Sequence, residues 1–358
     1  MDYLGIRIDL LLLFLTFFIS FGLYPFWINF VYKFNMGEVS RVHEHKQGIP
    51  TMGGLVFVLA VAVITLVLNR SRTQTLLPIF IALVSGLLGL LEDFTKVYKK
   101  SGLPALFEFK INVTKSWGIL NFLKAFRPWA AFKEFSRVVG SAGGSGLETY
   151  QKFIIQGLIG GFMAYWAYFK LGWDYIWMPL LGNIHLGFLY PIFIFLFFIA
   201  VLNAVAFTDG LDGLAGGLAL IAFLTFWAIS RSLGYNSLAG FCASFVGALL
   251  PFLYFNVFPA RIMMGNVGSH VLGAVLAVLA VVTHREVAFI FIGLVFLVDG
   301  VTSPLQQFSV KLTRKRLFRM APIHHHFEQL GWPESKVALR FWIFGMIFGL
   351  FGLFIALL

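Results

Sequence analysis

Ten segments of the chain are long and apolar enough to cross a lipid bilayer, or nearly so. They lie at about 8–32, 52–69, 76–91, 151–169, 187–206, 214–230, 237–255, 268–283, 286–307 and 338–357. A helix that spans the hydrocarbon layer needs roughly 20 predominantly apolar residues. The pattern therefore predicts an all-α integral membrane protein with about ten transmembrane helices.

The composition excludes a protein made of soluble domains. Charged residues make up 12% of the chain, whereas soluble domains carry about 25%. No polar block is long enough for a separate domain, so residues 1–358 are expected to form a single membrane domain. The one cysteine, Cys242, lies inside an apolar segment, which excludes a disulfide framework and a thiolate metal site.

Positive charges are distributed unequally between the two sides of the predicted helices. With the N-terminus outside, only six of the 27 lysines and arginines fall in outer loops, namely Arg7, Arg70, Arg72, Lys170, Arg231 and Arg285. Because cytoplasmic loops carry the excess of positive charge, both termini are expected on the periplasmic side. The N-terminal segment lacks a basic start and a small-residue cleavage site, so we interpret it as a first span.

The net charge of +11 favours anionic partners, either lipid headgroups or phosphorylated substrates. Nucleic acid is not expected, because the basic residues sit in short loops between spans. Residues 101–149 form a longer basic and aromatic insertion, whose composition favours one or two helices in the headgroup layer. Residues 140–146 are rich in glycine and serine, which is typical of a flexible linker.

Two carboxylates three residues apart, Asp209 and Asp212, follow the fifth apolar segment, which contains Asn203. In a turn followed by a helix they can face one pocket. Such a pair can hold Mg²⁺ together with substrate phosphate oxygens. Capping of the next helix explains one aspartate, but not easily both.

A second acidic pair, Glu92-Asp93, ends the third segment and is followed by Lys96. Acids at a helix C-terminus oppose the helix dipole, although a solvated cap stays open as an explanation. The functional interpretation is a base or nucleophile beside a cation that holds phosphate.

Two further polar clusters fall on the same predicted cytoplasmic side. The first holds Asn256 and Asn266, where Ser269 could also act only as a helix cap. The second is His324-His325-His326, which can bind phosphate or move protons near neutral pH, or can be an ordinary surface loop. Together the four clusters indicate a phosphoryl-transfer site with Mg²⁺ at the membrane surface, acting on a lipid.

The motifs resemble those of the phospho-N-acetylmuramoyl-pentapeptide transferase (MraY) family, within the polyprenyl-phosphate N-acetylhexosamine-1-phosphate transferases. They occur in the family's order as 50–54, Glu92-Asp93 ahead of Lys96, 203–215, Phe255-Asn256 with Pro259-Ala260, 264–269, 318–326, Gly331-Trp332-Pro333-Glu334 and Arg340-Phe341-Trp342. The resemblance covers nearly the whole chain outside the insertion. It implies ten spans in the bacterial inner membrane, a cytoplasmic active site, Mg²⁺ dependence and a homodimer.

The implied reaction transfers phospho-MurNAc-pentapeptide from UDP-MurNAc-pentapeptide to undecaprenyl phosphate, giving lipid I and UMP. The resemblance assigns the catalytic roles to Glu92, Asp93, Asp209, His324 and His325, and the metal to Asp209 and Asn266. It assigns substrate binding to Lys96, Asn203, Gly210, Leu211, Asp212, Asn256, Gln306 and His326.

Four positions depart from the family's pattern. Glu92 replaces an aspartate, Ala206 an asparagine, Asn266 an aspartate that binds Mg²⁺, and His270 a leucine. An amide oxygen can still coordinate Mg²⁺, but the site loses one negative charge. Three interpretations follow from the residues: an active transferase with an altered metal shell, a protein of the same fold with weak or no catalysis that still binds nucleotide or lipid, and a carrier that uses the carboxylates as an ion path.

Overall fold

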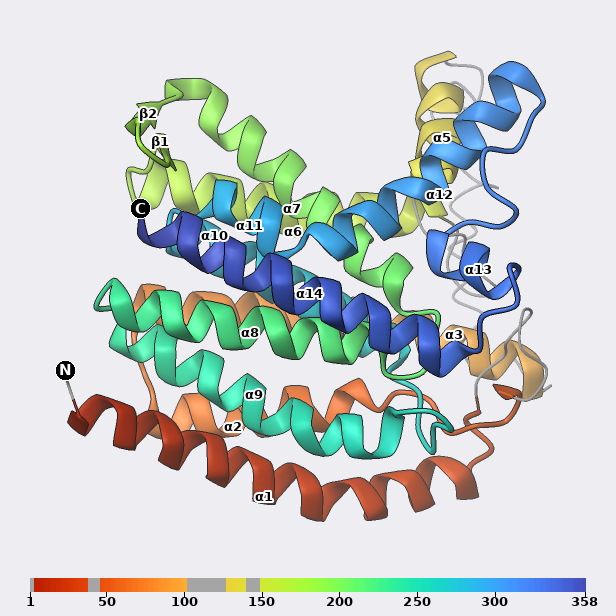
Figure 1. Ribbon diagram of the computed structural model, residues 1–358, viewed down its shortest axis with the longest axis horizontal. Helices are drawn as coiled ribbons and strands as arrows, with labels where there is room; N and C mark the ends of the chain where they lie inside the picture. Colours follow the sequence, from red (N-terminus) through yellow and green to blue (C-terminus); the bar gives the residue numbers. More distant parts are fainter. Residues whose placement is uncertain (1–2, 38–45, 102–126, 140–148) are drawn as a thin grey trace, which may run out of the picture.

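The computed structural model describes residues 3–37, 46–101, 127–139 and 149–358 (Figure 1). The described helices are α1 (Tyr3–Lys33), α2 (Gly54–Leu68), α3 (Leu77–Ser101), α5 (Arg127–Val139), α6 (Thr149–Tyr165), α7 (Tyr190–Thr208), α8 (Leu214–Ser232), α9 (Asn236–Asn256), α10 (Gly265–Val282), α11 (Glu286–Ile292), α12 (Leu294–Thr313), α13 (Ile323–Glu328) and α14 (Glu334–Leu357). Short π-helical turns occupy Arg72–Leu76 and Trp166–Lys170, and a 3₁₀ turn occupies Gly187–Leu189.

Each of the ten predicted apolar segments is helical, and the chain is an integral membrane protein. Among the described residues, seven helices are long and apolar enough to cross a membrane: α1, α3, α7, α8, α9, α10 and α14. The apolar helix α2 has 15 residues and is shorter than a full span. The total number of spans therefore remains a prediction.

The ninth segment, predicted as one span over 286–307, is corrected by the structure. It consists of α11 and α12, which meet at Gly293 with a bend of 80°. A side chain at Gly293 would collide with the ring of Phe289 in the preceding turn, so the bend places the backbone against that ring. Hydrophobicity alone could not locate this break, because the apolar run continues through it.

A β-hairpin also departs from the all-α prediction. β1 (Tyr175–Met178) pairs antiparallel with β2 (Gly182–His185), with Tyr175 opposite His185. Its first strand is Tyr-Ile-Trp-Met, and aromatic and β-branched residues favour strands. The hairpin lies at the same end of the molecule as both chain termini, whereas α5 and α13 lie at the opposite end (Figure 1).

The centre of the bundle is α10, which packs against α3, α7 and α2, while α1 packs along α9. Glycines permit the closest approaches. A Cβ at Gly54 would collide with the backbone of Gly268, so α2 and α10 cross in direct backbone contact. This crossing fixes the N-terminus of α10 beside residues 50–54.

Of the insertion 101–149, the structure describes Ser101, α5 and Thr149. In α5, Glu134 accepts a hydrogen bond from Lys311 of α12 at 2.8 Å, and this bond, with Arg137, holds the pKa of the Glu134 carboxyl below its usual value. The helical prediction is confirmed for α5. The linker 140–146 lies outside the described residues, and a position in the headgroup layer stays a prediction.

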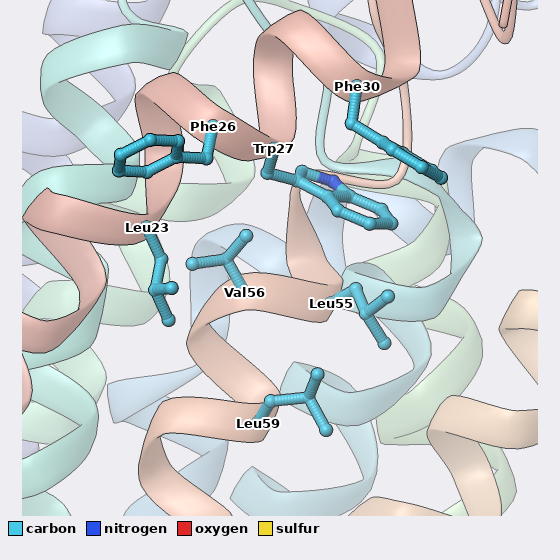
Figure 2. A pocket seen from close by; sticks show the side chains of 7 residues that line it. All are labelled: Leu23, Phe26, Trp27, Phe30, Leu55, Val56 and Leu59. Carbon is cyan, nitrogen blue, oxygen red and sulfur yellow. The ribbon is translucent and has the colours of Figure 1, made fainter.

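An apolar pocket of about 340 Å³ lies between α1 and α2 (Figure 2). Its lining consists of Leu23, Phe26, Trp27, Phe30, Leu55, Val56 and Leu59. The one polar group in this lining, the indole N–H of Trp27, donates to the carbonyl of Met52 at 3.1 Å. The pocket therefore offers no group for chemistry, and the candidate site lies elsewhere.

Candidate active site

The segment between α7 and α8 is held in place by a buried ion cluster. Lys46 forms an ion pair with Asp212, with 2.7 Å between Nζ and Oδ1, and a second one with Glu334 at the start of α14. All three side chains are buried. The second carboxylate oxygen of Asp212 accepts a hydrogen bond from the amide of Ala260 at 2.9 Å. Asp212 thus joins three distant parts of the chain at one point.

Asn256 holds the next residue of the same segment. Its Oδ1 accepts from the amide of Gly213 at 3.1 Å, and its Nδ2 donates to the carbonyl of Ile262 at 2.8 Å. Gly213 has a φ of +74°, a conformation that favours glycine, and its carbonyl accepts from the indole of Trp342 at 3.2 Å.

Asp209, Gly210 and Leu211 lie between these anchors. Asp209 directly follows the last residue of α7 and is half-buried, while Leu211 is buried. Gly210 lies against the imidazole of His324, where a Cβ would collide with Nε2. The structure thus brings the aspartate segment into contact with the first histidine of the histidine motif.

Asp93 is fixed by the N-terminus of α10. Its Oδ1 accepts from the backbone amide of Asn266 at 3.1 Å and from the Asn266 side-chain Nδ2 at 2.9 Å, and its Oδ2 accepts from the amide of Val267 at 3.1 Å. Three N–H donors at a helix N-terminus compensate a carboxylate well. The close approach requires Gly265, which has a φ of +75° and where a Cβ would collide with Asp93.

Glu92 faces two lysines. Lys96, one helical turn later, lies 3.2 Å from Oε1, and the same oxygen accepts from the buried Lys152 of α6. Lys96 is partly exposed, with 27% of its side chain accessible. The two cations therefore differ in role: Lys152 neutralises Glu92 inside the bundle, and Lys96 can also reach a ligand.

A chain of hydrogen bonds connects Asn203 to the same corner. Asn203 Nδ2 donates to Gln156 Oε1 at 3.0 Å, and Gln156 Nε2 lies 3.4 Å from His270 Nε2. His270 Nδ1 lies 2.8 Å from the carbonyl of Asn266. Three helices, α6, α7 and α10, thus meet in one buried polar layer beside the acidic pair.

The three histidines have different surroundings. His324 is fully buried and pairs with Asp299 of α12, with 2.8 Å between Nδ1 and Oδ2. His325 Nδ1 lies 2.6 Å from Glu328. His326 is half-buried and accepts a hydrogen bond at Nδ1 from the amide of Arg319 at 3.1 Å. The predicted triple-histidine motif therefore does not present three equivalent ligands.

Gln306 binds the backbone of the segment before α13. Its Oε1 accepts from the amides of Leu317 and Phe318 at 3.0 and 2.9 Å, and its Nε2 donates to the carbonyl of Phe318 at 2.9 Å. Gln306, which was predicted to bind substrate, therefore also holds the backbone of residues 317–318, in the segment that leads to the histidines.

The candidate metal ligands are the carboxylate of Asp209 and the side-chain amide of Asn266. Among the described residues no three histidine, cysteine or acidic side chains converge into a group that could hold a metal. Mg²⁺, however, is commonly held by one or two carboxylates together with substrate phosphates. Asn266 donates a hydrogen bond from Nδ2 to Asp93. The Oδ1 of Asn266, on the other branch of the same amide, takes no part in this contact. The donor types of this pair, a carboxylate and an amide oxygen, suit a hard cation such as Mg²⁺, and two protein ligands alone do not make a closed cage.

Five residues of this site were not predicted: Lys46, Lys152, Gln156, Asp299 and Glu334. Asp299 is an isolated acid inside an apolar segment, and such acids mark functional positions. Lys152 and Gln156 lie four residues apart on one face of α6. These two signals could have found three of the five. Lys46 gave no comparable signal, and Glu334 was named only as part of the motif Gly331-Trp332-Pro333-Glu334, without a role in the site.

Models of known protein families match two parts of the chain. The family model for glycosyl transferase family 4 matches residues 144–284, and a phospho-N-acetylmuramoyl-pentapeptide-transferase signature matches residues 46–58, the segment that contains Lys46. Ala206 and His270, which depart from the pattern expected of that family, lie within the matched region.

Curated relatives cover almost the whole chain. A protein from Geobacillus sp. (strain WCH70) is 34% identical over 98% of this chain and 98% of its own length. A protein from Clostridium perfringens (strain 13 / Type A) is 33% identical over 93% and 94%, and one from Staphylococcus carnosus (strain TM300) is 33% identical over 95% and 97%. Each is named phospho-N-acetylmuramoyl-pentapeptide-transferase. The chain belongs to the phospho-N-acetylmuramoyl-pentapeptide transferase family.

Proposed function

We propose that the protein transfers phospho-MurNAc-pentapeptide from UDP-MurNAc-pentapeptide to undecaprenyl phosphate, releasing UMP and producing lipid I for peptidoglycan synthesis. The observation that carries this proposal is the similarity to transferases of that name over nearly the full chain. The alternative of a binding protein without catalysis, and that of an ion-coupled carrier, receive no comparable support.

Asp93 is proposed as the group that deprotonates the lipid phosphate or attacks the diphosphate, with Glu92 as the second member of the pair. The fixed orientation of Asp93 supports this role, because a positioned carboxylate needs no reorganisation before the reaction. Lys96, His325 and His326 are proposed to bind phosphate, and Lys96 is accessible enough to do so. His324 is also proposed as a catalytic residue, and its imidazole lies against Gly210.

Gly210 and Leu211 are proposed to contact the uridine. Asn203, Asp212, Asn256 and Gln306 are proposed to shape this pocket, since each already binds neighbouring groups of the protein. The resulting pocket would be rigid, and rigid groups lose little entropy when a ligand binds.

The reaction is proposed to depend on Mg²⁺, held by Asp209 and the Oδ1 of Asn266 together with the diphosphate. A bound divalent cation supplies positive charge that offsets the repulsion between two anionic substrates. Only Asp209 of this pair is charged, so the protein's affinity for Mg²⁺ alone is expected to be low and to rise with the nucleotide.

The protein is proposed to have ten spans in the bacterial inner membrane, with both termini in the periplasm and the site at the cytoplasmic face. The excess of lysine and arginine on one side supports this orientation. Membrane lipids are proposed to surround the spans. A homodimer is expected from the family resemblance, and nucleic acid is not proposed as a partner.

The proposed function is tested by UMP release from purified protein supplied with Mg²⁺, undecaprenyl phosphate and UDP-MurNAc-pentapeptide. Wild-type protein should release UMP only when the lipid is present, and Asp93→Asn should abolish release. An exposed acid away from the site, changed as Glu134→Gln, serves as the matched control. Nucleotide binding without UMP release would instead support the non-catalytic alternative, and coupled uptake into sealed vesicles would support a carrier.

A further inference from the structure

A buried carboxylate in α12, Asp299, binds the first histidine of the triple-histidine helix twice. Its Oδ1 accepts from the backbone amide of His324 at 3.1 Å, and its Oδ2 lies 2.8 Å from the imidazole Nδ1 of the same residue. Both side chains are fully buried. One carboxylate thus fixes both the backbone and the ring of His324.

Thr302, one turn later on α12, makes a related contact that does not touch the ring. Its hydroxyl oxygen accepts from the amide of Ile323 at 3.0 Å. The first amides of a helix have no partner within it. Asp299 and Thr302 therefore both cap α13, but only Asp299 also binds an imidazole.

The hydrogen bond determines which ring nitrogen carries the proton. An ionised carboxylate can only accept, so Nδ1 must donate, and Nε2 of a neutral ring is left with its lone pair. Nε2 is buried and has no hydrogen-bond partner among the described residues. It points at Gly210, in the segment that contains Asp209.

We propose that Asp299 is a positioning residue of the transfer reaction, which sets the tautomer and orientation of His324 so that Nε2 faces the Asp209-Gly210 backbone. The importance of this orientation for turnover rests on the proposed function. The orientation itself does not, because it follows from the contacts of Asp299. The competing explanation is that Asp299 is only a structural cap of α13.

The first experiment measures the tautomer. Protein labelled with ¹⁵N-histidine is examined by NMR in detergent micelles, and His324→Gln identifies the His324 signals. Wild-type His324 should show a protonated Nδ1 and an unprotonated Nε2. Asp299→Asn keeps an acceptor for the backbone amide, but its amide N–H faces Nδ1 and should move the proton to Nε2. Thr302→Ala removes only the neighbouring cap and should leave the tautomer unchanged.

The second experiment measures UMP release by the same variants. Asp299→Asn should lower kcat by roughly 10- to 100-fold, the usual effect of removing a group that orients another, with KM for the nucleotide substrate unchanged. Asp299→Glu restores a carboxylate and should recover much of the loss, whereas Thr302→Ala should retain most of the wild-type kcat.

Two results would overturn the proposal. One is a wild-type tautomer and kcat in Asp299→Asn, and the other is an equal loss of kcat in Thr302→Ala, which would make Asp299 a cap only. If wild-type protein releases no UMP, the proposed function fails, but the NMR experiment still decides the orientation of His324.

Discussion

At Lys46 one ammonium group forms ion pairs with two buried carboxylates, those of Asp212 and Glu334. Removing one partner of a buried ion pair leaves an uncompensated charge, which costs about 3–5 kcal/mol. We therefore expect Lys46→Met to lower the free energy of unfolding by about this amount. The matched control is Lys311→Met, which breaks the exposed pair with Glu134 and should cost about 0–1 kcal/mol. Denaturant titration in micelles measures both, and equal effects would contradict the ion cluster.

Gly210 is a second residue whose identity is set by a contact. Alanine at this position would place a methyl group into the ring of His324. Overpacking a buried site costs about 1–3 kcal/mol, and here it must also shift the imidazole. We expect Gly210→Ala to reduce UMP release strongly while the protein still folds. Gly161→Ala is the control, because a Cβ at Gly161 meets nothing within 4 Å and should leave activity unchanged.

Asn266 donates its side-chain N–H to Asp93, so its replacement by an acid reverses the interaction. In Asn266→Asp two carboxylates would face each other, and like charges at this distance repel unless a cation separates them. We expect the variant to unfold at a lower temperature than wild type in EDTA, and Mg²⁺ to restore much of the difference. Wild-type protein should respond less to Mg²⁺. A variant that is insensitive to Mg²⁺ would argue against a cation at this position.

At the scale of the elements, helices were predictable and their interruptions were not. Apolar length locates α7 or α9 within a few residues, because the hydrocarbon layer dictates how long such a run must be. The bend at Gly293 depends on packing against Phe289, and the β1–β2 hairpin depends on the surface of α11 that it covers. Neither contact is visible in the local sequence.

The sequence motifs named several candidate site residues, but they did not reveal the partners of those residues. The motifs identified Asp93, Asp212 and His324, because acids and histidines are costly at membrane boundaries. Their partners lie far away in sequence: Lys46 for Asp212, and Asn266 for Asp93. Pairing across such distances is decided by how α2, α10 and α14 pack.

The turn between α10 and α11 carries a prediction about pH. His284 is buried there between the rings of Trp173 and Tyr175, whose centroids lie 4.6 and 4.5 Å from that of the imidazole. Burial, with the adjacent cation of Arg285, lowers the pKa of His284 to about 4. An unfolded histidine has a pKa of about 6.5. Between these values the unfolded chain binds a proton that the folded chain does not.

Stability supplied by neutral His284 is therefore fully present above about pH 6.5 and is lost as the pH falls toward 4. The loss amounts to about 3 kcal/mol over this interval. His284→Asn tolerates the positive φ of this position and does not titrate. Unfolding temperatures measured from pH 7 to pH 4.5 should fall less steeply for the variant than for wild type. Parallel curves would show that His284 already becomes protonated in the folded protein.

At the scale of the whole molecule, the two ends of the bundle differ in chemistry. One end holds both termini and the hairpin, and the other holds α5, α13 and the segment before α13 (Figure 1). That segment, from Arg314 to Arg319, is rich in basic residues. The buried polar contacts of the candidate site connect to this second end through His324 and Asp299. Positive charge at this end of the bundle would attract anionic substrates toward the candidate site.

The same asymmetry predicts which end faces the cytoplasm. In a Cys242→Ala background, which removes the one native and buried thiol, single cysteines can be placed at exposed positions of each end. Asn183→Cys marks the hairpin, and Lys315→Cys marks the basic segment. Because positive loops stay inside, a membrane-impermeant maleimide added to intact spheroplasts should label the first variant and spare the second until the cells are opened. Labelling of Lys315→Cys in intact spheroplasts would reverse the orientation, and would place the acidic pair and the histidines on the side where no nucleotide-linked sugar is made.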